Sequence, residues 1–94
     1  MAVTVKLVGA LRHMSGKNQL SISHQKAMTL MDLITKISKE APELKPNLIS
    51  QQPDEPKANA LILVNGREIS VLNGLETQLN DGDEIVFVPV VHGG

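Results

Sequence analysis

Apolar and polar residues alternate at the start of the chain. Val3, Val5 and Leu7 fall on one side of an extended segment, with polar residues between them. This period of two predicts a strand with one buried face. A second alternating run occupies residues 19–23, after a Ser-Gly-Lys-Asn turn signal. The two runs are therefore expected to form a hairpin joined by a long turn.

The period then changes to that of a helix. The apolar positions at the new spacing are Leu30, Leu33, Ile34 and Ile37. They lie on one face of a helix. Thr29 is suited to cap its N-terminus, and Asp32 three residues later completes a variant of the capping box. Pro42 cannot continue a helix, so the helix is expected to end near Glu40.

Residues 42–59 contain four of the five prolines and are expected to be loop-like. A short apolar turn within this stretch is expected to dock on the core; its members are Leu44, Leu48 and Ile49. Strand character returns at residues 60–64, and Asn65-Gly66 follows as a hairpin signal before a return strand at residues 67–71. Residues 84–88 form a nearly all-apolar last strand, which Pro89 is expected to end.

This order of elements predicts an α+β protein. One main helix must cover one face of a mixed sheet of four to five strands, with the first and last strands paired in the middle. That arrangement is the β-grasp, or ubiquitin-like, fold. Residues 1–88 are expected to form the β-grasp domain, and residues 89–94 a flexible C-terminal Gly-Gly tail.

Composition narrows the range of functions. The 94 residues suit a single domain, and 41% of them are hydrophobic, near the globular average. The chain has one Phe and no Trp or Tyr, and its net charge is −1, so direct nucleic-acid binding is not expected. It has no cysteine for a disulfide, a thiolate nucleophile or a metal site. No segment resembles a signal peptide or a membrane span, which favours a cytoplasmic protein without membrane attachment.

Side chains for catalysis are not evident. The histidines have no metal-ligand spacing, and the acidic group Asp81, Asp83 and Glu84 is better explained as a turn followed by a strand start than as a metal site. No nucleophile–base pair is recognisable, so we do not expect the isolated chain to be an enzyme or to hold a metal or cofactor. Arg12 and Arg67 are either ordinary solvated residues or charges that steer an acidic partner.

Two features suggest a binding role. Val8 breaks the polar side of the first strand, and Val86 and Val88 fall on the outer side of the last. If these strands are neighbours, the three valines form an exposed apolar patch, together with Leu63, that fits a partner protein. The second feature is the ending Pro89-Val90-Val91-His92-Gly93-Gly94. Six extended residues reach about 20 Å, and glycine allows close approach to a partner's catalytic centre.

These residues resemble a known family. The matching stretches are Val3-x-Val5-x-Leu7, Leu11-Arg12, residues 63–67 and, most specifically, Asp81-Gly82-Asp83-Glu84 leading through residues 85–92 to Gly93-Gly94. The chain is similar to the ubiquitin-like sulfur carriers, which include the small subunit of molybdopterin synthase, the thiamine sulfur carrier, the ubiquitin-related modifiers and the archaeal small modifier proteins. His92 is a departure from the molybdopterin subunits, and the His-Gly-Gly ending is closer to the ubiquitin-related modifiers.

The resemblance implies a mechanism centred on Gly94. A ubiquitin-activating-type enzyme would use ATP to adenylate the Gly94 carboxylate, and a persulfide would convert it to a thiocarboxylate. The sulfur would then pass to a pterin precursor for molybdopterin or tungstopterin, to thiamine, or to tRNA. In the pterin pathway the large subunit of molybdopterin synthase would be a partner. Pro89 and His92 would contact the activating enzyme alongside the apolar patch, and Gly93 would let the tail enter its channel.

Two other interpretations stay open. The activated Gly94 could be joined to lysines of target proteins, as in a ubiquitin-like modifier. The chain could also be a β-grasp binding module whose tail is incidental. Removal of Gly93 and Gly94 separates the third interpretation from the first two, because only the binding module would keep its function.

Overall fold

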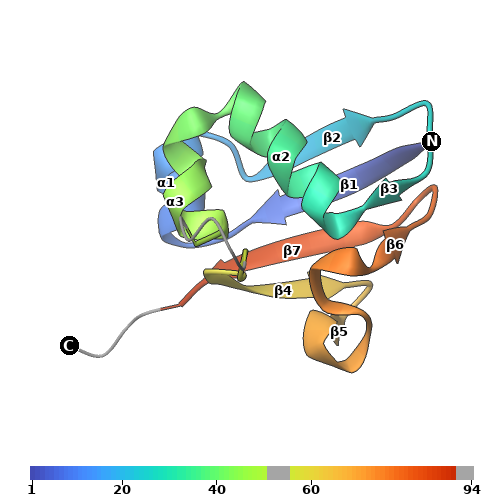
Figure 1. Ribbon diagram of the computed structural model, residues 1–94. Helices are drawn as coiled ribbons and strands as arrows, with labels where there is room; N and C mark the ends of the chain where they lie inside the picture. Colours follow the sequence, from blue (N-terminus) through green and yellow to red (C-terminus); the bar gives the residue numbers. More distant parts are fainter. Residues whose placement is uncertain (51–55, 91–94) are drawn as a thin grey trace.

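A computed structural model describes residues 1–50 and 56–90 of the chain. Its main sheet has five strands in the order β2-β1-β7-β4-β5. The bounds of these strands are β1 Ala2–Leu7, β2 Gln19–Ser23, β4 Ala60–Val64, β5 Arg67–Glu68 and β7 Glu84–Pro89. β1 and β7 are parallel neighbours in the middle, and all other pairs in this sheet are antiparallel. The predicted mixed β-grasp sheet, with first and last strands paired, is confirmed (Figure 1).

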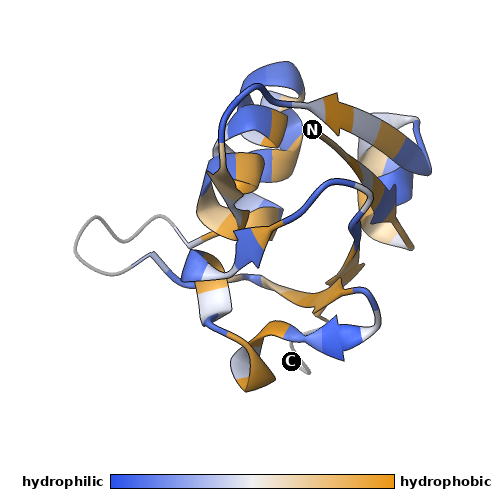
Figure 2. Ribbon diagram, turned by 90° about the vertical axis from the view of Figure 1, so that its right-hand side faces the viewer, coloured by the Kyte–Doolittle hydropathy of each residue, from blue (hydrophilic) through white to orange (hydrophobic). Residues whose placement is uncertain are grey.

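Helix α2, Leu30–Glu40, packs across one face of this sheet (Figure 1). The four positions predicted for its apolar face, Leu30, Leu33, Ile34 and Ile37, are all fully buried. They meet Val3, Val5 and Leu7 of β1 and the pair Ile85 and Phe87 of β7 in one hydrophobic core. Figure 2 shows the apolar stretches along the central strands and the mixed apolar and polar surface of α2. Alternation in the strands and the helical period therefore identified the core correctly.

The start of α2 has the predicted capping box. The Asp32 backbone N–H donates to Thr29 Oγ1 at 3.1 Å, and the Thr29 N–H donates to Asp32 Oδ2 at 3.0 Å. These bonds satisfy amide groups that a helix N-terminus otherwise leaves unpaired. The hydrogen bond from the Thr29 backbone, followed by that of its side chain, holds the pKa of the Asp32 carboxyl below its usual range.

The connection between the first two strands differs from the predicted long turn. It contains a short helix, α1, Ala10–Ser15, whose Leu11 is buried in the core. Gly9 before it has φ +58°, and Gly16 after it is left-handed with φ +73°. A helix of six residues is too short to produce a clear period in the sequence. The turn signal in the sequence, Ser-Gly-Lys-Asn at residues 15–18, contains the glycine that ends this helix.

The region after α2 is more ordered than the loop that was predicted. A 3₁₀ turn, η1, Pro42–Leu44, leads into α3, Lys45–Leu48. The predicted docking of this segment is confirmed, because Leu44, Leu48 and Ile49 are all buried. Residues 51–55, within the stretch predicted to be loop-like, lie outside the described part of the chain.

The hairpin at Asn65-Gly66 is confirmed, with φ +51° and +82° at its two turn residues. Its return strand is shorter than residues 67–71, because only Arg67 and Glu68 pair in β5. The chain then enters the 3₁₀ turns η2, Ile69–Val71, and η3, Gly74–Glu76. Glu68 starts η2 by accepting hydrogen bonds from the Ser70 N–H and hydroxyl, at 2.6 and 2.7 Å. The sequence prediction did not anticipate that these side-chain hydrogen bonds of Glu68 would start a turn where a strand was expected.

A second sheet of two short strands was also not predicted. β3, Met28–Thr29, pairs with β6, Gln78–Leu79. Two-residue strands have no readable period, but Met28 and Leu79 are buried and close one end of the core. In the described part of the chain, none of the helices has the length and apolar character that crossing a membrane requires.

Candidate functional site

The outer face of the sheet, opposite α2, carries the predicted apolar patch. We call Val8, Leu61, Leu63, Val86 and Val88 the sheet patch. The register places Leu63 beside Val86 and Leu61 beside Val88 on neighbouring strands. Val8 continues β1 along β7, with its N–H donating to the Phe87 carbonyl at 3.4 Å. Val8 and Leu61 are exposed by 37% and 41%, and the other three members are half-buried. The first and last strands thus bring together side chains far apart in sequence.

Leu61 was absent from the predicted patch. It stands two positions before Leu63, so it faces the same way. The run at residues 60–64 is entirely apolar, and its alternation does not show which side is exposed. The two-residue spacing from Leu63 was the available signal. Val90, which follows the strand and is 48% exposed, was assigned to the tail.

Charged residues lie next to the patch. Lys6 pairs in register with Val86, and its Nζ lies 3.2 Å from Glu84 Oε2. Both side chains are nearly half exposed, so this ion pair contributes little to stability. An apolar centre with charges at its edge is the usual composition of a protein interface.

Pro89 takes a different position from the one predicted. It is the last residue of β7 and pairs with Ala60, so the strand runs one residue past the predicted end. β1 ends at Leu7, and although the Val8 N–H still donates to the Phe87 carbonyl, Pro89 has no N–H with which to extend the β1–β7 ladder further. The Pro89 ring lies against Gly9, where a Cβ would stand 3.2 Å from Pro89 Cγ. The predicted site residues His92, Gly93 and Gly94 lie outside the described residues.

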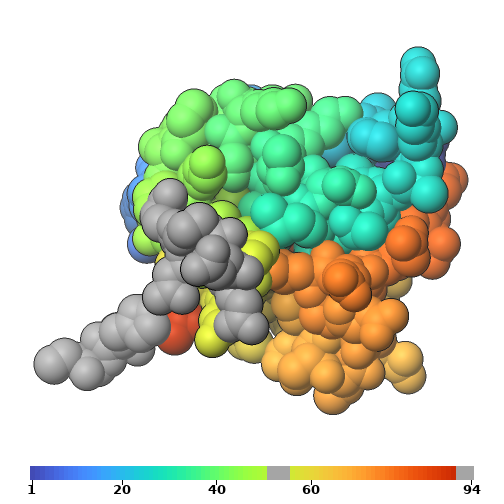
Figure 3. All heavy atoms as spheres, viewed as in Figure 1, coloured from blue at the N-terminus to red at the C-terminus, as the bar shows by residue number. Residues whose placement is uncertain are grey.

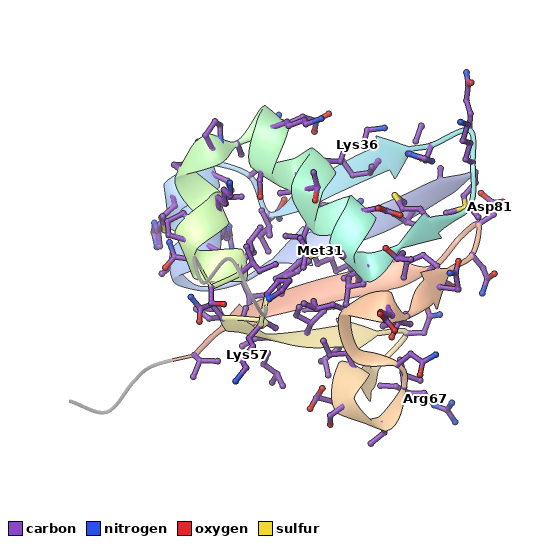
Figure 4. The ribbon with its side chains drawn as sticks, in the orientation of Figure 1. Met31, Lys36, Lys57, Arg67 and Asp81 are labelled. Carbon is purple, nitrogen blue, oxygen red and sulfur yellow. The ribbon has the colours of Figure 1, made fainter. Side chains whose placement is uncertain are left out.

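Arg12 lies beside the end of β1. It lines a cavity of about 350 Å³ together with Lys6, Val8 and Gly9. The cavity is therefore next to one end of the sheet patch and carries two cationic side chains. Arg67 lies elsewhere, in β5 at the far edge of the sheet (Figure 4). Of the two arginines, only Arg12 is positioned to meet a partner that covers Val8.

The acidic group near the last strand has a structural role. Asp83 is buried; its carboxylate accepts hydrogen bonds from Asn65 Nδ2 at 2.9 Å and from the Asn80 N–H at 2.7 Å. Asp81 accepts from the Ala2 N–H at 2.8 Å, and Glu84 pairs with Lys6. The three carboxylates serve different partners, so the interpretation as a turn and strand start is confirmed. Within residues 1–50 and 56–90, no cluster of three potential ligand residues could hold a metal ion.

Comparisons with known proteins identify a family and several relatives with the same fold. The model of the ThiS family matches residues 5–94. Ubiquitin-related modifier 1 of Schizosaccharomyces pombe is 33% identical over 99 residues, covering all of both chains. The solution structure of small archaeal modifier protein 1 from Methanosarcina acetivorans has a TM-score of 0.84 and 33% identity, covering 99% of this chain and 96% of that one. The BexX/CysO complex of Amycolatopsis orientalis contains a chain with a TM-score of 0.74 and 26% identity, covering 98% and 99%.

Proposed function

We propose, since this chain belongs to the ThiS family of ubiquitin-like sulfur carriers, that it carries sulfur as a thiocarboxylate on the carboxyl group of Gly94. The observation that carries this proposal is the placement of the sheet patch. Val86 and Val88 lie on β7, the strand that leads directly toward Gly93-Gly94. A partner bound to the patch therefore stands next to the start of the tail.

The chemistry would be supplied by an activating enzyme. The Gly94 carboxylate attacks the α-phosphorus of ATP, and pyrophosphate leaves. The terminal sulfur of a persulfide then attacks the acyl carbon of the adenylate and displaces AMP. A thiol cleaves the resulting sulfur–sulfur bond and leaves the thiocarboxylate. This chain contributes its terminal carboxylate and its docking surface, and ATP is held by the enzyme.

We propose an adenylating enzyme of the ubiquitin-activating type as the partner on the sheet patch. The apolar side chains would form the centre of the contact, and Lys6, Glu84 and Arg12 would lie at its edge. In the A. orientalis complex a similar chain is bound to another protein, which supports the proposal that this chain docks on a protein partner. Pro89 would act through its contact with Gly9, which sets where the chain leaves the sheet. His92 would act as a spacer between the strand and Gly93.

The acceptor of the sulfur is a further part of the proposal. We propose tRNA, a pterin precursor and thiamine as the candidate acceptors, and the His-Gly-Gly ending resembles that of the ubiquitin-related modifiers. Transfer to a molybdopterin precursor, with a large synthase subunit as partner, is one of these alternatives within the same chemistry.

Intact-mass analysis tests the carrier function. The protein is incubated with ATP, a cognate activating enzyme and a persulfide donor. We expect a mass gain that corresponds to sulfur replacing one oxygen. A variant that lacks Gly94 should not gain this mass. If the full chain stays unchanged with active enzyme, the carrier proposal is wrong.

Protein modification is a second candidate function. Ubiquitin-related modifier 1 of S. pombe and small archaeal modifier protein 1 of M. acetivorans are named as modifiers, and both align over almost the whole chain. The same acyl-adenylate would then be attacked by a lysine amine, giving an isopeptide bond and AMP. Adducts of higher mass that survive thiol reduction and require Gly94 would establish this function.

A further inference from the structure

The helix side of the molecule contains a cavity that the carrier function does not use. It has a volume of about 240 Å³ and lies between α2 and the segment that follows it. Met31, Ile34 and Ser38 line it from α2, and Lys45 and Ile49 line it from the other side. Figure 3 shows the surface of α2 and of the following segment in green and cyan. The sheet patch is on the opposite face of the sheet, so the two surfaces are separate.

The cavity combines an apolar floor with cationic side chains. Ile34 is fully buried and Ile49 nearly so, while Met31 is half-buried and has a flexible thioether side chain. Lys39 and Lys45 line the same cavity and are exposed. In the part of the chain that the structure describes, neither lysine forms an ion pair. The site therefore offers a place for an apolar group that has a negative charge next to it.

Ser38 adds an unused hydrogen-bonding group. Its hydroxyl oxygen is buried and has no hydrogen-bond partner among the described residues. A helical Ser or Thr commonly donates to the carbonyl four residues earlier, and Thr35 does so to Met31 at 3.0 Å. Buried polar groups without partners are uncommon and need an explanation. The hydroxyl has no hydrogen bond to lose among the described residues, so rotation about the Cα–Cβ bond to meet a bound group breaks none.

The size of the cavity limits what it could hold. Ligand pockets for drug-sized molecules have volumes of about 300–1,000 Å³. A cavity of about 240 Å³ is smaller than that range and suits a single side chain better than a cofactor. We propose that this cavity binds a segment of a partner protein, in which an apolar side chain enters the cavity and an adjacent carboxylate pairs with Lys39 and Lys45 and accepts a hydrogen bond from Ser38.

A second hollow continues the positive surface on the other flank of α2. Thr35 and Lys39 line both hollows, and the second also contains His24, Lys26 and Lys36. Figure 4 shows Met31 and Lys36 on opposite sides of α2. The one carboxylate lining either hollow is Asp32, which is already hydrogen bonded to Thr29. The partner segment would therefore cross α2 over Thr35 and Lys39, with further acidic residues toward Lys26 and Lys36.

An NMR titration with a defined peptide tests the proposal. The probe is a short peptide of glutamate, leucine and aspartate with both ends capped. Controls replace its two acidic residues by glutamine and asparagine, or its leucine by alanine. We expect saturable shifts of the methyl groups of Met31, Ile34 and Ile49, and binding at least about fivefold weaker for each control peptide. Shifts confined to the sheet patch, no saturable shift, or equal binding of the uncharged peptide would overturn the proposal.

Protein variants then identify the contacts. Combined Lys39→Gln and Lys45→Gln substitutions should weaken binding of the acidic peptide at least about fivefold, whereas Lys17→Gln, on the loop after α1, should not. Ser38→Ala should also weaken binding while the melting temperature stays the same or rises, because the lost hydroxyl had no partner. Unchanged binding in the double lysine variant contradicts the proposal. Shifts of the cavity methyls on concentrating the protein alone would indicate a second copy as the occupant, which also contradicts it.

Discussion

Gly9 and Pro89 touch at the point where the first and last strands of the sheet end. A Cβ on Gly9 would stand 3.2 Å from Pro89 Cγ, and Gly9 itself has φ +58° and ψ −133°. Residues with a side chain rarely adopt this conformation. The Gly9 carbonyl also accepts hydrogen bonds from the N–H groups of Arg12 and His13, at 3.1 and 3.3 Å. One glycine therefore joins the start of α1 to the residue at which the chain leaves the sheet.

Gly9→Ala should destabilise the protein by about 2 kcal/mol, because the backbone is strained and Pro89 must move. Gly16→Ala is the matched control, since Gly16 also has positive φ but has open space around it. Its cost should be about 1 kcal/mol. Urea unfolding measures both free energies. Equal costs for the two variants would show that the Pro89 contact has no energetic role.

Thr29→Ala should cost about 1 kcal/mol of unfolding free energy, because it removes half of the capping box at α2. Thr35→Ala, on the exposed part of the same helix, serves as the control, since Thr35 bonds only to the carbonyl four residues earlier. Its effect should be below about 0.5 kcal/mol. The comparison fails if Thr35→Ala proves as damaging as Thr29→Ala.

The capping box also predicts a pH dependence. The folded state lowers the pKa of Asp32, so the ionised carboxylate stabilises the fold above the unfolded-state pKa of about 3.9. This contribution should disappear as the pH falls through the lower folded-state pKa. Asp32→Asn should therefore be less stable than the natural chain at neutral pH, and the difference should shrink in acid. Thr29→Ala keeps the backbone N–H that bonds the Asp32 carboxylate, so NMR titration should show the pKa of Asp32 moving only part of the way back up. An unchanged pKa there would refute a contribution from the Thr29 side chain.

Val88→Asp should abolish detectable binding to the activating enzyme while the protein stays folded. Val88 is half-buried between strands at the sheet patch, and an interface there would bury the new carboxylate without a partner. Val71→Asp is the control, because Val71 is 72% exposed in η2, outside the sheet patch. Calorimetric titration measures binding, and circular dichroism checks the fold. Full binding by Val88→Asp would exclude the sheet patch as the docking site.

The sequence predicted the elements that have a clear period. Val3, Val5 and Leu7, and the four apolar positions of α2, define the core and with it the fold. The short elements could not be predicted, because six residues in α1 or two in β3 do not establish a period. The sequence predicted Val8, Val86 and Val88 as one exposed patch, because this follows once the first and last strands are neighbours. Leu61 was missed inside an all-apolar run, and the position of Arg12 depends on a helix that the sequence did not predict.

The position of β7 has a consequence for synthesis of the chain. β7, in the middle of the sheet, is the last strand to be synthesised. The Ala2 N–H can gain its side-chain acceptor only after Asp81, 79 positions later, has been added to the chain. A growing chain cannot assemble this core until residues 84–89 have left the ribosome, because β1 and β4 meet only through them. Any shorter product would expose the unpaired edges of two strands and be open to proteases. Only chains that have been translated through β7, the strand from which the tail extends, can therefore complete the fold.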